Sequence, residues 1–327
     1  MEEKVDILLA TYNTNIEYLK KQIDSILSQS YKNINILISD DNSTNKDIQE
    51  VLNQYQNQDN RITVYLQEKN IGYIQNFEFL LEKSEADYIM FADHDDIWYP
   101  EKVEKSIRKL KDENVDLVYC NAHQINENGE IIKESYFTYK NIPLIKGKSN
   151  LAISRCIGIG CSQIFTKELK QKMLPFTHQV IAHDWLAAFV ANEAKGMSYI
   201  EEQLFGYRLH NTNVFGGRSL AQNLDRWKKE HGTDYSSYLK YRQESVVDKA
   251  YLNGAKMCLQ YATIEKNKEF LKKLIDYYES LEKSKYFNCH ILKYFHFLKG
   301  KNLFKKMIKE IIIFHFPILG YIQFKFN

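Results

Sequence analysis

Apolar runs alternate with segments of helical spacing along the first half of the chain. Four runs are apolar and end in polar turn residues, which is typical of strands buried on both faces of a sheet: residues 5–13, 34–43, 61–67 and 87–93. In three segments between them apolar residues recur every three or four positions, which predicts helices: residues 16–29, 47–55 and 71–84. This alternation predicts an α/β fold with a mostly parallel sheet.

The pattern is less regular further along the chain. It predicts a helix over 96–110, a strand over 115–126, a glycine-bearing strand or turn leading into a helix over 157–169, a helix over 183–194, and a strand or hairpin over 197–213. After Gly217 the composition changes, and residues 220–285 have helical spacing and are rich in Lys, Glu and Tyr. We therefore predict an α/β domain over residues 1–217 and a helical C-terminal region over 218–327.

Three of the predicted strands end in clusters of polar residues, "ATYN", "SDDNS" and "ADHDD". The carboxyl ends of parallel strands meet at one edge of a sheet, where open α/β sheets bind their ligands, so we expect these clusters to converge on one crevice. In the third cluster Asp93, His94, Asp95 and Asp96 follow the apolar run directly. Packed carboxylates repel one another and lose hydration, which predicts a compensating positive charge.

Asp93 and Asp95 form an Asp-x-Asp pair that can hold a hard divalent cation, with water and phosphate oxygens as the remaining ligands. A pair of this kind, taken alone, is more often a solvated turn that caps the following helix. Two neighbouring polar strand ends favour the cation site.

The other two strand ends offer groups that suit a nucleobase. Tyr12 can stack on a base while Thr11 and Asn13 bond its edge, although ordinary packing explains Tyr12 equally well. The carboxylate of Asp40 or Asp41 can accept a hydrogen bond from a pyrimidine ring N–H, or it can cap the helix that follows.

Composition excludes several classes of protein. The 44 Lys and Arg residues nearly balance the 42 Asp and Glu residues, which argues against a nucleic-acid binder that relies on phosphate contacts. The five cysteines include no Cys-x-x-Cys pair, so we expect reduced thiols, as in the cytoplasm, rather than a zinc site or a disulfide framework. Neither a signal peptide nor a run of the ~18–20 apolar residues that a spanning helix needs is apparent.

Taken together, the ordered motifs resemble those of the inverting nucleotide-sugar glycosyltransferases of family 2, which have the GT-A fold, a Rossmann-like α/β sheet with flanking helices. The resemblance covers roughly residues 4 to 215 and rests on "ATYN", "SDDNS", "NIGYIQN", "FADHDDIWYPEKV", "HDW" and "YRLHNTN". Each motif is weak by itself, but the ordered set is specific. The forms "DHDDIW", "HDW" and "YRLHNTN" look most like the bacterial rhamnosyltransferase-type branch, which builds cell-surface polysaccharides such as capsules.

The resemblance implies a role for each matched residue. Asp184 would be the catalytic base that deprotonates the acceptor hydroxyl, and Asp95 with His210 would hold Mn²⁺ or Mg²⁺ on the donor diphosphate. Gly160, His183 and Trp185 would lie near the donor or the acceptor. The remaining matched residues would bind the nucleotide sugar: Thr11, Tyr12, Asn13, Asp41, Asn76, Asp93, His94 and Arg208.

The "DHDD" form leaves two candidates for the main metal ligand. We favour Asp95, because Asp96 can cap the helix predicted to begin near Ile97. The chemistry is consistent with inversion, since glycosyl transfer passes through an oxocarbenium-like state and needs one base opposite the departing diphosphate. His183 and Asp184 could instead simply begin a helix.

The predicted activity is metal-dependent sugar transfer onto a growing polysaccharide or a lipid-linked precursor. L-Rhamnose from dTDP-rhamnose is the first choice of donor, and a UDP-hexose is the alternative. A catalytically silent carbohydrate-binding or scaffold subunit of the same fold is a further alternative. The absence of Gly-x-Ser-x-Gly and Walker A motifs argues against a serine hydrolase and a nucleotide hydrolase.

The C-terminal residues 286–327 combine lysines with bulky aromatic residues. Such a tail can lie on an anionic membrane surface, or it can pack on the catalytic domain or on a second subunit of a homodimer. A lipid-linked acceptor favours membrane contact, which would place the protein at the inner face of the cell membrane.

Overall fold

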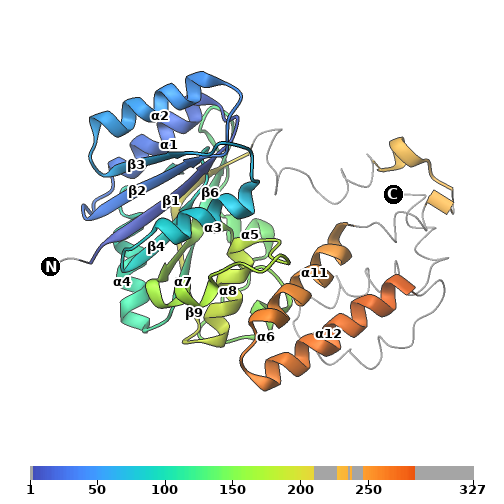
Figure 1. Cartoon of the computed structure of the whole chain (residues 1–327). Helices are drawn as coiled ribbons and strands as arrows, with labels where there is room; N and C mark the ends of the chain where they lie inside the picture. Colours follow the sequence, from blue (N-terminus) through green and yellow to red (C-terminus); the bar gives the residue numbers. More distant parts are fainter. Residues whose placement is uncertain (1–2, 210–226, 235, 238–245, 284–327) are drawn as a thin grey trace.

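The computed structural model describes residues 3–209, 227–234, 236–237 and 246–283 (Figure 1). Its strands are β1 (Val5–Thr11), β2 (Ile34–Asp40), β3 (Ile62–Leu66), β4 (Tyr88–Ala92), β5 (Ile97–Trp98), β6 (Leu117–Ile125), β7 (Ile131–Lys133), β8 (Gln163–Thr166) and β9 (Met197–Arg208). Its helices are α1 (Ile16–Leu27), α2 (Lys46–Gln58), α3 (Tyr73–Lys83), α4 (Lys102–Glu113), α5 (Tyr136–Lys140), α6 (Asn150–Ser154), the 3₁₀ helix η1 (Gly160–Ser162), α7 (Lys167–Met173), α8 (His183–Glu193), α11 (Val246–Tyr261) and α12 (Glu265–Lys283).

The strands form one sheet in the order β3-β2-β1-β4-β8-β6-β9-β5, with β7 paired to β6. Strands β1 to β4 are mutually parallel, whereas β8 runs antiparallel to its neighbours β4 and β6. In Figure 1, α1 and α2 lie on one side of β1–β3 and α3 lies on the other. Apolar residues such as Ile7, Leu8 and Leu9 of β1 are fully buried between these layers. The predicted α/β fold with flanking helices is confirmed.

The register of the parallel strands brings their polar ends together. Thr11 of β1 pairs with Asp40 of β2, and Leu9 of β1 pairs with Ala92 of β4, the residue before Asp93. The three polar clusters therefore leave the sheet at the same edge, as the sequence predicts.

The helix predicted over 96–110 is wrong in its first part. Ile97 and Trp98 form β5, which pairs antiparallel with Gly206 and Phe205 of β9, and α4 begins only at Lys102. The reason is Pro100, because a proline disfavours helical backbone angles at the residue before it. Asp96 therefore precedes a strand and does not cap a helix.

Where it is described, the C-terminal region is helical, as predicted. The helix α11 packs on α6 and α8, and α12 packs on α11 (Figure 1). The ring of Trp185 at the start of α8 meets Tyr251 of α11 edge-on, with ring centroids 6.1 Å apart. The boundary at 217/218 and the tail over 286–327 lie outside the described residues, so both predictions remain untested.

The helices α11 and α8 are in close contact where Gly254 of α11 meets the ring of Trp185 of α8. A Cβ added to Gly254 would lie 2.1 Å from Cη2 of Trp185, so Gly254→Ala forces the two helices apart. We expect this change to lower the free energy of unfolding by about 1–3 kcal/mol, the usual cost of overpacking, as measured by urea denaturation. Replacement of the exposed Lys249 on the same helix by Ala is the control, with an expected change within about 0.5 kcal/mol. Equal stability of the two variants would contradict this packing.

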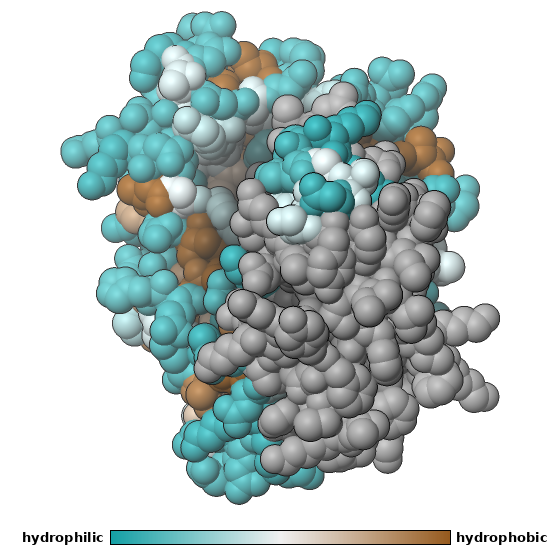
Figure 2. Space-filling view, turned by 90° about the vertical axis from the view of Figure 1, so that its right-hand side faces the viewer, coloured by the Kyte–Doolittle hydropathy of each residue, from teal (hydrophilic) through white to brown (hydrophobic). Residues whose placement is uncertain are grey.

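Among the residues coloured in Figure 2, hydrophilic ones predominate and the brown apolar patches are small. Among the helices of the described residues, none combines the length and apolar character needed to cross a bilayer.

Candidate functional site

The ends of β1 and β2 are tied together by hydrogen bonds. The backbone N–H of Asn13 donates to Ser43 Oγ at 2.9 Å, and the backbone N–H of Thr44 donates to Asn13 Oδ1 at 2.8 Å. Asn13 has a φ of +46°, which Asn tolerates better than most residues. This geometry leaves the side chain of Tyr12 45% exposed beside the loop, whereas Thr11 is buried. The Tyr12 ring is therefore free to stack on a planar ligand.

Asp41 joins the second strand end to the start of α3. Its two carboxylate oxygens accept hydrogen bonds from the backbone N–H groups of Ile71 (2.7 Å) and Gly72 (2.9 Å). Asp40 instead closes its own turn by accepting from Ser43. Asp41 thus fixes the loop that precedes α3. This structural role does not depend on whether Asp41 also binds a ligand.

The third strand end forms an acidic turn, Asp93 to Asp96. Asp93 is partly buried, Asp95 is 7% exposed, and Asp96 is fully buried. Burial, with a smaller contribution from the neighbouring Asp95, raises the pKa of Asp93 to about 6. The same two causes raise the pKa of Asp96 well above its ordinary value, because burial and the neighbouring charge both disfavour the ionised carboxylate.

A buried lysine supplies part of the expected positive charge. Lys102, the first residue of α4, is fully buried, and its ammonium donates to the carbonyl oxygen of Cys161 at 2.5 Å. The ammonium also lies 3.6 Å from the ring centroid of Trp98 and 4.0 Å from that of Phe205. Asp96 and Asp93 act on it electrostatically, while burial lowers its pKa. Lys102 is thus a buried cation close enough to the acidic turn for Asp96 and Asp93 to act on its charge.

Arg208 supports the turn through backbone groups. Its own N–H donates to Asp96 Oδ1 at 3.0 Å, and its Nε donates to the carbonyl oxygen of Asp95 at 2.7 Å. The guanidinium lies 4.4 Å above the ring of Tyr18, and the residue is fully buried. Arg208 therefore holds the Asp96 carboxylate through its backbone N–H and the backbone of Asp95 through its side chain. His210 lies outside the described residues.

The first turn of α8 lies close to the acidic turn. Asp184 is partly buried, and its Oδ1 accepts the backbone N–H of Trp185 at 2.8 Å. Its charge contributes to the raised pKa of Asp93, less than burial and the charge of Asp95 do. Gly160 of η1 packs against this turn, since a Cβ at Gly160 would lie 2.8 Å from Nε2 of His183 and 3.6 Å from Cβ of Asp184.

Not every residue singled out in the sequence reaches this region. The indole of Trp185 packs towards α11, and Asn76 is buried in α3, where its Nδ2 donates to the carbonyl oxygen of Ser39 at 3.0 Å. His94 is partly buried and lowers the pKa of Asp93 slightly by its charge. The roles of all three in ligand binding remain predictions.

Two residues of this region, Lys102 and Cys161, were not predicted from the sequence as site residues. Lys102 shares a helix face with Ser106 and Leu110, so helical spacing alone marks it as an inward-facing lysine. Cys161 has no such signal, because its position next to Asp93 and Asp96 depends on the pairing of β8 with β4 and β6.

The acidic turn fits a hard divalent cation. Asp93, Asp96 and Cys161 each offer one ligand atom, and these atoms lie within 4.8 Å of one another. Cys161 and Asp96 are fully buried, and burial raises the pKa of the Cys161 thiol, which disfavours the thiolate as a ligand. Carboxylate oxygens such as those of this turn suit Mg²⁺ or Mn²⁺. The helix-capping reason for preferring Asp95 to Asp96 is wrong, and the choice of Asp95 as the main ligand remains a prediction.

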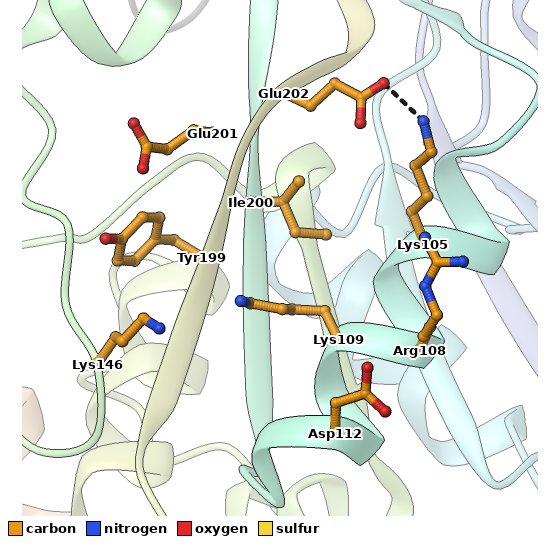
Figure 3. A pocket seen from close by; sticks show the side chains of 9 residues that line it. All are labelled: Lys105, Arg108, Lys109, Asp112, Lys146, Tyr199, Ile200, Glu201 and Glu202. Atoms are coloured by element: carbon orange, nitrogen blue, oxygen red, sulfur yellow. Dashed lines mark hydrogen bonds and ion pairs between the residues drawn. The ribbon is translucent and has the colours of Figure 1, made fainter.

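A separate hollow of about 290 Å³ lies between α4 and β9 (Figure 3). Charges of both signs line it, and Lys105 spans it to an ion pair with Glu202 at 2.6 Å. None of the residues assigned to the site from the sequence lines this hollow.

Comparisons with known proteins agree with this geometry. The sequence profile described as "Glycosyl transferase family 2" matches residues 6–174, more than half of the 327 residues. An uncharacterized glycosyltransferase of Methanocaldococcus jannaschii is 30% identical over 227 residues, which cover 67% of this chain and 76% of that protein. The UDP-Glc:alpha-D-GlcNAc-diphosphoundecaprenol beta-1,3-glucosyltransferase of Escherichia coli is 27% identical over 199 residues, 59% of this chain and 73% of that protein.

Among solved structures, residues 1–349 of TarS from S. aureus in complex with UDP are similar in fold. The TM-score is 0.53 at 15% identity, and the superposition covers 87% of this chain and 93% of TarS 1–349. At this identity the likeness supports the fold alone.

Proposed function

This chain belongs to glycosyl transferase family 2, and we propose that it is a metal-dependent inverting enzyme that transfers a sugar from a nucleoside diphosphate to a cell-surface glycan precursor. The observation that carries the proposal is the convergence of an exposed aromatic ring, an acidic turn and the Asp184 carboxylate at one edge of the sheet.

The role proposed for each residue of the site follows from its position. Tyr12 stacks on the base, and the loop held by Asp41 lies beside it. Asp93 and Asp95 would hold Mn²⁺ or Mg²⁺, with His210 as a further ligand, and such a cation neutralises charge on the departing diphosphate. Asp184 accepts the proton of the acceptor hydroxyl. Arg208 holds the turn through the carbonyl oxygen of Asp95, and Lys102 binds the carbonyl oxygen of the neighbouring Cys161.

Inversion is proposed because Asp184 is the base that acts from the side opposite the leaving diphosphate. A base positioned in this way makes a single displacement sufficient, whereas retention needs a second nucleophile.

We propose a UDP-hexose or dTDP-rhamnose as donor. The Escherichia coli relative, named for UDP-Glc and a diphosphoundecaprenol-linked acceptor, supports the first, and the "DHDDIW" and "HDW" motifs support the second. A lipid-linked acceptor would also give the basic, aromatic tail over 286–327 a use at the inner face of the membrane.

The proposal is tested by a panel of UDP, dTDP, GDP and CDP, each with and without Mn²⁺, in thermal unfolding of the whole chain. A ligand at 100 times its dissociation constant stabilises the folded state by about 2.7 kcal/mol. We expect the midpoint to rise with UDP or dTDP, and only when Mn²⁺ is present. No rise with any nucleotide in folded protein would favour a catalytically silent subunit of the same fold.

A further inference from the structure

The imidazole of His183 is enclosed by aromatic rings and makes no hydrogen bond. His183 is the first residue of α8 and is only 8% exposed. Its ring centroid lies 4.0 Å from that of Phe77, with the planes tilted by 31°, and 4.5 Å from that of Phe91, which meets it edge-on. Both ring nitrogens are buried, and neither has a hydrogen-bond partner among the residues that the structure describes. Leaving a buried donor and a buried acceptor unmatched is costly, so this histidine is poorly suited to be mere packing.

The backbone next to the imidazole contains a glycine at the point of closest approach. A Cβ on Gly160 would lie 2.8 Å from Nε2 of His183, so the close approach requires glycine at that position. Gly158, two residues earlier, has a φ of +77°, which also favours glycine. The segment thus places backbone against one ring nitrogen, and its two glycines have the conformational freedom that a shift of this backbone needs.

The next residue along α8 is Asp184, the proposed base. His183 thus lies on the same turn as the group that must meet the acceptor hydroxyl, and beside the strand β4 that ends in the acidic turn. A Cβ on Gly160 would also lie 3.6 Å from Cβ of Asp184, so a ligand bound at Asp184 would lie next to this segment.

We propose that His183 is a substrate-contacting residue whose imidazole hydrogen-bonds a sugar hydroxyl when the Gly158–Gly160 segment shifts upon binding. The inference rests on the proposed function, because it needs a sugar in this crevice.

A hydroxyl is the matching partner for two reasons. Burial lowers the pKa of His183 to about 4, an effect that the charge of Asp184 opposes only in part, so the ring is neutral at pH 7. A neutral imidazole carries one N–H donor and one acceptor nitrogen, and a hydroxyl can both accept and donate. A phosphate has no proton to donate and favours a cation, which this ring does not provide.

The test compares nucleotide with nucleotide sugar in thermal unfolding with Mn²⁺: UDP against UDP-glucose, and dTDP against dTDP-rhamnose. The variants are His183→Phe, which keeps the aromatic stacking, and His183→Leu, in case the larger phenyl ring does not fit. We expect both to keep the shift given by the nucleoside diphosphate and to lose the additional shift given by the sugar. The loss corresponds to about tenfold weaker binding of the sugar-bearing ligand. His183→Gln, which restores a donor and an acceptor, should recover part of it.

The ligand-free stability gives a second readout. His183→Phe and His183→Leu remove polar atoms that have no hydrogen-bond partner among the described residues. At least one of these variants should therefore have a thermal unfolding midpoint equal to or above that of the wild type. Ser106→Ala is the matched control, since its hydroxyl is also buried without a partner but lies on α4. It should leave both nucleotide and sugar shifts unchanged.

The outcomes separate the two sources of the hydroxyl. If the variants lose the additional thermal shift that the sugar gives, the hydroxyl bound by His183 belongs to the donor sugar. If that additional shift is intact and transfer to a GlcNAc-diphosphate-lipid acceptor is about tenfold slower, the hydroxyl belongs to the acceptor. The inference would be overturned if both variants kept the additional thermal shift from the sugar and the wild-type rate of transfer. It would also be overturned if both variants unfolded below the wild type and lost the thermal shift from the nucleoside diphosphate as well. A wild type that responds to no nucleotide would instead defeat the proposed function itself.

Discussion

Replacement of Asp184 by Asn should slow sugar transfer by a factor of about 10²–10⁴ and leave nucleotide binding nearly unchanged. Asparagine has the shape of aspartate and can still accept the backbone N–H of Trp185, so the first turn of α8 keeps its structure. It cannot accept the proton of the acceptor hydroxyl, and general bases contribute a rate factor of this size. The measurement is the initial rate of transfer, combined with the thermal shift produced by UDP or dTDP with Mn²⁺.

The control is Asp47→Asn. Asp47 is the second residue of α2, as Asp184 is the second residue of α8. Its side chain is exposed, and we assign it no role in binding or catalysis. Both substitutions remove a negative charge from the first turn of a helix, and each should cost the small stabilisation that such a charge provides. Only the Asp184 variant should lose transfer. Full activity in that variant would remove Asp184 from the mechanism.

Much of the fold was accessible from the sequence because its signals are local. Buried strands of a parallel sheet leave continuous apolar runs, and polar residues at their ends mark the binding edge, so the convergence of Thr11, Asp40 and Asp93 could be predicted. Where the local signal was ambiguous the prediction was wrong. The run after Asp96 has helical spacing, yet pairing with the distant β9 makes Ile97 and Trp98 a strand.

The electrostatics of the site could not be predicted in this way. The charge of Lys102 is buried between Trp98, its near neighbour, and Phe205, which β9 brings from the other half of the chain. His183 is likewise enclosed by Phe77 and Phe91, which belong to different elements. The motif "HDW" places His183 beside the base, but only the packing shows that its nitrogens are unmatched. Pairings across the sheet decide these environments, and spacing along the chain does not encode them.

The acidic turn makes the stability of the metal-free protein depend on pH. The Asp93 carboxyl ionises near 3.8 ordinarily but at about 6 in the folded protein, so over this window the folded state binds more protons than the unfolded state. The free energy of unfolding should therefore fall as the pH rises from about 4 to about 6, by at most ~3 kcal/mol for Asp93. Urea denaturation in EDTA at several pH values measures this fall.

Asp95→Asn should have two opposite effects on this system. Without metal the variant should lose less stability than the wild type between pH 4 and pH 7, because the negative charge of Asp95 is, after burial, the main cause of the raised pKa of both Asp93 and Asp96. With Mn²⁺ the variant should bind UDP or dTDP at least about a hundredfold more weakly, since even outer-shell changes at metal sites cost 10–100-fold. Carboxylates that repel one another in the metal-free turn are thus the groups that we propose as ligands of the cation.

Asp96→Asn distinguishes the two candidate ligands. Asp96 is fully buried and binds the backbone N–H of Arg208, so its replacement should preserve the dependence of nucleotide binding on Mn²⁺. If Asp96→Asn abolishes that dependence and Asp95→Asn does not, the ligand is Asp96 and the turn must open to expose it. Loss in the Asp95 variant alone would assign the cation to Asp95, while Asp96 and Arg208 hold the turn through the hydrogen bond between them.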